Sequence, residues 1–167
     1  MDWQYTESFT AGTVGPQGRR IFFIQACCDD QIISLKVEKQ QIAGLADFFT
    51  GILQDLPSEK RTDQLDSDCL PIDTQKTSFF DPGEADWVIG NLGVTYEQTN
   101  DRLILIAEEL TIDEDSEPAE ARFPLSRSQV KEFIEITHNL IAASRPPCPY
   151  CGAPLDPDAA GWCPCAN

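Results

Sequence analysis

Basic residues are scarce in this sequence, which has 12 Lys and Arg against 28 Asp and Glu and a net charge of −16. Such a charge repels nucleic acid and anionic membrane surfaces, and so argues against both as non-specific partners. Long apolar runs are also absent, because no stretch approaches the ~18 residues that a membrane-spanning helix needs. The N-terminus, Met1-Asp2-Trp3-Gln4, lacks the basic and apolar regions of a signal peptide. We therefore expect a cytoplasmic protein with no membrane partner.

Catalytic signatures are equally scarce. His138 is the only histidine, so no serine-histidine-acid set can be argued from it. No G-x-G-x-x-G precedes a predicted helix, and no Gly-Lys-Ser/Thr follows the glycines at 15–18. The acidic run at 113–120 lacks the spacing of a calcium loop. Whether the protein is an enzyme stays open, with the residue pattern leaning against it.

Two segments of the chain are similar to each other. An aromatic residue followed by G-x-V-G at 9–15 recurs as an aromatic residue followed by G-x-L-G at 87–93. An arginine that opens an apolar strand recurs as Arg20 and Arg102, and the apolar face of an amphipathic helix also recurs. The offsets of 78, 82 and 88 residues keep the three matches in order. Because ordered matches rarely arise by chance, we expect an internal duplication.

Each copy predicts three strands followed by a helix. Runs rich in β-branched and aromatic residues, separated by glycine, proline or aspartate turns, predict the strands. Apolar residues at i, i+3, i+4 and i+7 predict the helices, and Ser126 with Gln129 fits a capping box. Pro146-Pro147 ends the second helix. The expected strands are 7–15, 19–28, 31–37, 86–97, 102–110 and 120–125, and the helices begin near 38 and at 126.

These elements predict an α+β fold. It consists of an internally duplicated βββα unit, with mainly antiparallel sheets and two packed helices that share one core, plus a small C-terminal zinc-knuckle tail. The stretches 21–24 and 103–107 are apolar at every position, which is typical of strands buried on both faces. We expect helices on one face and the second copy or a second subunit on the other, so a homo-oligomer stays open. The expected parts are repeats at 1–54 and 87–145, an acidic linker at 55–86 and the tail at 146–167. We expect the linker to be extended and to drape over the fold, partly anchored by scattered hydrophobic residues that include Phe79 and Phe80.

Four of the seven cysteines lie in the last 20 residues. Cys148-Pro149-Tyr150-Cys151-Gly152 is a knuckle in which a tight turn aims two sulfurs at one point, and Cys163-Pro164-Cys165 is one residue shorter. Zinc takes four such ligands in a tetrahedron, and a site closed in this way is structural. A site of three thiolates with an open fourth position is the alternative. The sequence thus predicts Zn²⁺ bound by Cys148, Cys151, Cys163 and Cys165.

Other candidates have a structural and a functional interpretation. Glycines at matched positions suit bulges or close backbone approaches, or paired backbone clamps for a ligand. The matched arginines suit a paired anion site, or salt bridges to the acidic linker. Cys27, Cys28 and Cys69 lack an evident neighbouring base, and buried cysteine is often simply structural. A ligand site between the copies would consist of Arg20, Arg102, Gly12, Gly15, Gly90 and Gly93.

Both ends of the chain resemble a known bacterial family. Residues 9–15, 20–26 and 37–41 resemble the opening of domain-of-unknown-function family 3090, and residues 145–152 and 155–157 resemble its C-terminus. The resemblance spans essentially the whole chain. It implies a soluble bacterial protein and, because the family carries no established activity, no reaction. The family has a basic residue at the position of Cys165, so the ligands that the resemblance implies are Cys148, Cys151 and Cys163.

The leading functional hypothesis is a non-enzymatic adaptor or regulatory subunit. Its tail would bind another protein through Tyr150 and Trp162, since aromatic residues are favoured at interfaces. The alternative is an enzyme or sensor that binds a phosphorylated or nucleotide-like small molecule between the two repeats. Binding of nucleic acid by the tail is disfavoured by the charge.

Overall fold

The computed structural model describes residues 2–57, 78–111 and 116–144, and within the tail residues 148, 150, 151, 155, 163 and 165. Its strands begin and end within two residues of the predicted bounds, and the helices begin within one. The expected division into domains stays a prediction, and most of the linker lies outside the described residues. The elements are β1 (Ser8–Val14), β2 (Ile21–Cys28), β3 (Gln31–Val37), α1 (Lys39–Asp55), β4 (Trp87–Glu97), β5 (Arg102–Glu109), β6 (Glu120–Leu125) and α2 (Arg127–Ala142).

The six strands form one mixed sheet in the order β1-β2-β3-β4-β5-β6. Each half is an antiparallel meander. The halves meet where β3 and β4 run parallel, through the pairs Leu35–Trp87 and Lys36–Val88. The prediction of mainly antiparallel pairing is confirmed within each half, but this junction is parallel. The reason is that β4 follows a helical crossover, which returns the chain in the direction of β3.

Tight turns fix the register of the first meander. Asp29 and Asp30 have φ values of 48° and 64°, the pair of positive angles that a two-residue type I′ hairpin requires. They join Cys28 to its partner Gln31. At the other turn Gly15 has φ of 103°, and a Cβ there would lie 2.9 Å from the Arg19 carbonyl oxygen. Both turns therefore use residues that tolerate the left-handed region.

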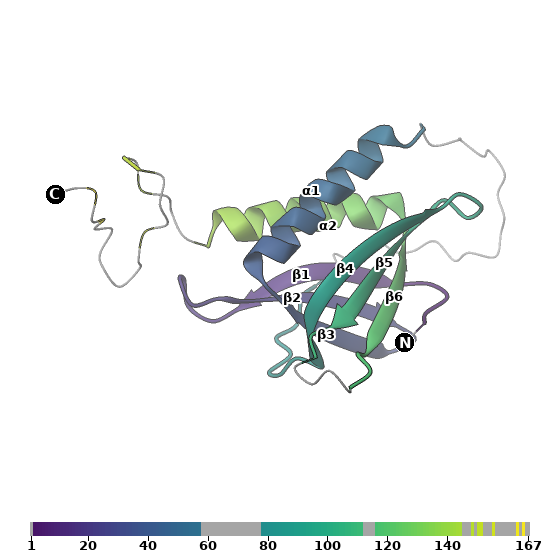
Figure 1. Cartoon of the computed structure of the whole chain (residues 1–167), viewed down its shortest axis with the longest axis horizontal. Helices are drawn as coiled ribbons and strands as arrows, with labels where there is room; N and C mark the ends of the chain where they lie inside the picture. The colour runs from purple at the N-terminus through teal and green to yellow at the C-terminus, as the bar shows by residue number, and fades with distance from the viewer. Residues whose placement is uncertain are drawn as a thin grey trace.

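One hydrophobic core lies between the sheet and the two helices, which cover the same face (Figure 1). Its centre is aromatic. The ring centroids of Phe9 and Phe133 are 4.8 Å apart, those of Phe49 and Phe133 are 5.9 Å apart, and those of Phe9 and Phe123 are 6.1 Å apart. These rings come from β1, α1, β6 and α2, so the prediction that both halves share one core is confirmed.

The outer face of β2 is covered by the chain that leads into β4. Phe79 packs beside Phe23 with ring centroids 6.2 Å apart. The Phe80 backbone N–H donates to the Gln25 side chain, and the Gln25 amide donates back to the Phe80 carbonyl, at 3.0 and 3.1 Å. A Cβ on Gly12 would lie 2.1 Å from the Phe79 ring. The expected cover was a second copy or a second subunit, and the structure instead uses residues from between the halves.

β5 differs from this pattern. Leu103, Leu105 and Ala107 are buried, whereas Ile104 and Ile106 between them are half-buried. The prediction that 103–107 is buried on both faces is therefore wrong.

The N-terminal residues lie along the free edge of β6. Asp2 forms a parallel bridge with Arg122, and the Trp3 ring meets the Phe123 ring edge-on at 5.4 Å. The sheet thus has parallel pairing at both places where one half meets the other. The internal duplication itself stays a prediction, because equal element order does not establish common origin. Neither helix of the described chain is long and apolar enough to cross a membrane.

Candidate metal centre

The cysteine segment begins just after α2. Ser126 and Gln129 form the predicted capping box at the start of this helix. At its end, the backbone N–H of Ala143 and that of Ser144 donate to carbonyls of the last turn, at 3.0 and 3.1 Å. Figure 1 shows the described tail residues beyond this end of α2, on the far side from β4, β5 and β6. The tail is therefore attached to the body through the C-terminus of a core helix.

The structure brings all four tail cysteines together. Their sulfur atoms lie within 4.8 Å of one another. The Sγ atoms of Cys148 and Cys165 are 3.5 Å apart, as are those of Cys151 and Cys163. A disulfide would hold its sulfurs at about 2.05 Å, so these are free thiols. Cys148 and Cys163 are buried, while Cys151 and Cys165 are exposed.

The polypeptide around the first knuckle favours a thiolate. The backbone N–H groups of Cys151 and Tyr150 donate to the Cys148 sulfur and lower its pKa to about 6. In the second knuckle, hydrogen bonds with the sulfurs of Cys151 and Cys163 raise the pKa of the Cys165 thiol. Four thiolates so close together repel one another, and a divalent cation at their centre would reverse that effect.

The donor set fits a four-coordinate metal ion. Four sulfurs around an ion at about 2.3 Å form a tetrahedron with edges of about 3.8 Å. The observed separations of 3.5 Å and at most 4.8 Å bracket this edge. Cys165 lies within the cluster, so the shortened second knuckle still brings its sulfur to the other three. The four cysteines could hold a metal ion with no open position.

Sequence comparison places these features in a known family. A family model described as a protein of unknown function, DUF3090, matches residues 1–163. The chain belongs to the DUF3090 family. The match includes Cys148, Cys151 and Cys163 and ends before Cys165. No curated protein and no solved structure shows a significant match.

In this DUF3090 protein the two matched arginines lie apart. Arg102 begins β5 opposite Glu97, whereas Arg20 precedes β2 and donates to the Ala143 carbonyl at 3.1 Å. β2 and β5 are three strands apart in the sheet, about 14 Å at ~4.8 Å per strand. Neither described cavity contains both arginines.

The matched glycines have structural reasons that differ. Gly12 admits the Phe79 ring, and Gly15 occupies a turn of positive φ. A Cβ on Gly90 would meet the Leu110 backbone at 3.0 Å, beside the bulge in β4. Gly93 would make only an ordinary contact, at 3.9 Å. Close approach, the structural interpretation, thus accounts for Gly12 and Gly90.

The remaining candidates make no constellation among the described residues. The exposed His138 lies 3.9 Å from an Asp47 carboxylate oxygen. Burial raises the pKa of the Cys27 and Cys28 thiols, which makes both poorer nucleophiles. Cys69 and Trp162 lie outside the described residues.

Sequence reasoning missed a second group of chemical interest. Lys39 and Ser144 are 105 residues apart in the chain and form a hydrogen bond, and both line a cavity with Arg20. A local signal for Lys39 existed, because it lies at the start of a predicted helix. No local signal links it to Ser144.

Proposed function

We propose that this protein is a cytoplasmic zinc-binding adaptor, whose cysteine tail is folded by one structural Zn²⁺ and docks onto another protein. The observation that carries the proposal is the convergence of four sulfurs within 4.8 Å. Soft thiolate donors in a tetrahedral S₄ set suit Zn²⁺ or iron–sulfur chemistry. Two knuckles around one centre suit a single zinc ion.

A structural role follows from the donor count. Four protein ligands leave no position for water or substrate, whereas catalytic zinc keeps one open. The knuckle also presents an aromatic side chain, since Tyr150 is 83% exposed. An exposed tyrosine on a rigid turn is the kind of group that anchors protein interfaces. The net charge of −16 favours a protein partner over a nucleic acid.

Metal analysis tests the zinc site. The full chain, purified with its thiols reduced, should carry about one Zn²⁺ per chain. The double variant Cys148→Ser/Cys151→Ser should carry almost none, while Cys27→Ser should keep the full amount. Iron in place of zinc, or equal zinc in all three proteins, would refute the proposed site.

Docking is tested with immobilised protein and cell extract. The wild type and Tyr5→Ala, a control at an exposed tyrosine of the body, should retain the same partner. Tyr150→Ala, which leaves all four cysteines in place, and the double cysteine variant should both lose it. Retention that does not depend on the tail variants, or no specific retention at all, would contradict the adaptor role.

A further inference from the structure

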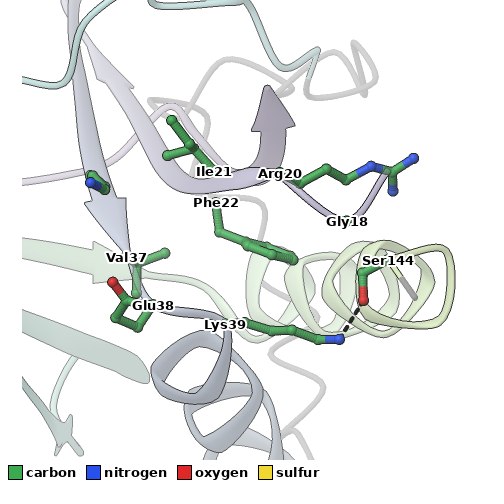
Figure 2. A pocket seen from close by; sticks show the side chains of 9 residues that line it. Gly18, Arg20, Ile21, Phe22, Val37, Glu38, Lys39 and Ser144 are labelled. Carbon is green, nitrogen blue, oxygen red and sulfur yellow. Dashed lines mark hydrogen bonds between the residues drawn. The ribbon is translucent and has the colours of Figure 1, made fainter. Parts of the chain in front are cut away.

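A cavity of about 390 Å³ lies where the tail joins the body. Its walls come from the β1–β2 turn, the end of β3, the start of α1 and the residue Ser144 just after α2 (Figure 2). The volume falls within the range of small-molecule sites, about 300–1,000 Å³. Three segments far apart in sequence, at 18–22, 36–39 and 144, thus form one concave surface.

The lining concentrates positive charge in an acidic protein. Arg20, Lys36 and Lys39 line the cavity, and they are three of only 12 basic residues in the chain. Glu38 is the one carboxylate among the lining residues. Phe22 and Val37 add apolar surface. A cationic pocket in a chain of net charge −16 is the opposite of what the composition alone would give.

Two of the cations converge at the end of α2. The Arg20 guanidinium donates to the Ala143 carbonyl at 3.1 Å, and the Lys39 ammonium donates to the Ser144 hydroxyl. Figure 2 shows both side chains extending toward this end of the helix, with Phe22 between them. Their positive ends also offset the negative C-terminus of the helix. They are therefore held in place before any ligand arrives.

Both side chains have further N–H groups with which to bind a ligand. Arginine has five N–H donors and a lysine ammonium has three, and among the described residues each side chain donates one to the end of α2. α1 begins at the same cavity, and its first turn is already capped by Glu38 and Gln41. The Arg20 guanidinium and the Lys39 ammonium together match the oxygens of one phosphate.

We propose that this cavity binds a small phosphomonoester that carries hydroxyl groups. The phosphate contacts Arg20 and Lys39, a hydroxyl donates to Glu38, and the carbon skeleton packs on Phe22. This site differs from the one expected between the repeats, since Arg102 takes no part in it. It stands independently of the zinc site.

Titration of the full zinc-loaded chain tests the proposal. The probes are glycerol 3-phosphate, inorganic phosphate and glycerol, followed by amide NMR shifts. We expect saturable shifts at Phe22, Lys39 and Ser144 with glycerol 3-phosphate, weaker binding of inorganic phosphate and none of glycerol. Arg20→Gln and Lys39→Gln should each weaken binding at least about tenfold, the loss of one charged hydrogen bond. Shifts that do not saturate, or that spread over the surface, would overturn the proposal.

Matched variants separate binding from stability. Lys39→Arg keeps a positive charge at the start of α1 and should bind more tightly than Lys39→Gln. Arg122→Gln removes an exposed arginine far from the cavity and should leave binding unchanged. If Lys39→Arg binds as weakly as Lys39→Gln, the charge at this position does not hold the ligand and the proposal fails. Equal weakening by Arg122→Gln would show general charge attraction and would also overturn it.

Discussion

At the scale of single residues, Gly12 is the position where one atom decides the packing of a whole segment. A Cβ there would lie 2.1 Å from the Phe79 ring, whereas a Cβ on Gly44 in α1 would meet nothing within 4 Å. We expect Gly12→Ala to lower the free energy of unfolding by about 1–3 kcal/mol through overpacking. Gly44→Ala should raise it by about 0.5–1 kcal/mol, since alanine favours a helix interior.

Urea unfolding of the two variants measures both effects. The variant Phe79→Ala supplies the second half of the test. In its background Gly12→Ala should cost much less, because the ring it displaces is gone. The same loss from Gly12→Ala with and without Phe79 would show that this ring does not press on Gly12.

The Asp101 carboxylate makes the stability of the fold depend on pH. Hydrogen bonds from Arg127 and Tyr96 hold the pKa of its carboxyl below the usual value. A lowered pKa means that the carboxylate stabilises the fold above about pH 4, and that this contribution is lost as pH falls through the lowered value. Because Asp101 is half exposed, Asp101→Asn should cost about 1 kcal/mol or less at pH 7. The difference from wild type at pH 7 should shrink at low pH, as the carboxyl of the folded protein becomes protonated.

Unfolding at the two pH values checks this expectation. Asparagine tolerates the φ of 51° at position 101, so the substitution tests the charge rather than the turn. Asp30→Asn, at another residue of positive φ, is the matched control and should show no such change between the two pH values. A cost for Asp101→Asn that persists at low pH would mean that geometry, not charge, carries the effect.

At the scale of elements, each helix is tied to the opposite half by a glutamine in its first turn. The Gln41 side chain accepts from the Glu38 backbone N–H and donates to the Gly90 carbonyl in β4. Gln129 accepts from the Ser126 backbone N–H and donates to the Thr6 carbonyl at the foot of β1. Capping by Gln129 was predicted and is confirmed, and Gln41 makes the same kind of cap. The crossing contacts were not predicted, because they join segments 49 and 123 residues apart.

We expect Gln41→Ala and Gln129→Ala each to lower the free energy of unfolding by about 1–2 kcal/mol. Each variant loses a helix cap and a hydrogen bond from the helix to the opposite half of the chain. Hydrogen exchange should quicken near Gly90 in the first variant and at the start of β1 in the second. Gln40→Ala, at an exposed neighbour in the same turn, is the control and should change little. If either variant lowers the free energy of unfolding no more than Gln40→Ala does, its glutamine does not hold the helix to the opposite half.

Other elements show where local pattern stops being informative. The strands and helices were predictable because period two and period 3.6 are local properties. The cysteine cluster was predictable for the same reason, since each knuckle is read from adjacent residues. The β3–β4 junction was not, because parallel pairing through two residue pairs leaves no local mark. The linker was expected to drape over the fold through its hydrophobic residues, but the place of Phe79 on β2 was not predictable, since Phe79 belongs to no periodic run. The hydrogen bond of Arg20 to Ala143 beside the cavity joins residues 123 positions apart.

At the scale of the whole molecule, the described cysteines of the tail lie apart from the core of the body. The buried Cys148 and Cys163 are not part of the hydrophobic core cluster in the described chain. Removal of the proposed zinc by a chelator should therefore change the unfolding free energy of the body by less than about 1 kcal/mol. Proteolysis within 145–167 should quicken at least about tenfold, because sites of this kind generally fold only with their metal.

Circular dichroism and timed proteolysis, with and without chelator, give both readouts. The double variant Cys148→Ser/Cys151→Ser should behave like the chelated wild type and should not respond to the chelator. Loss of sheet signal on chelation would show that the body depends on the metal. An unchanged rate of cleavage within 145–167 would show that the fold of the tail does not depend on the metal.

The parallel junction also has a kinetic meaning. Each meander pairs neighbours joined by ten residues or fewer, so it can form with little loss of loop entropy. The β3–β4 contact must wait for about 50 residues of chain, from Val37 to Trp87, to close. We infer an order of assembly in which two independent meanders appear early and join late. The rate-limiting search in folding is then the meeting of the two halves rather than the formation of either.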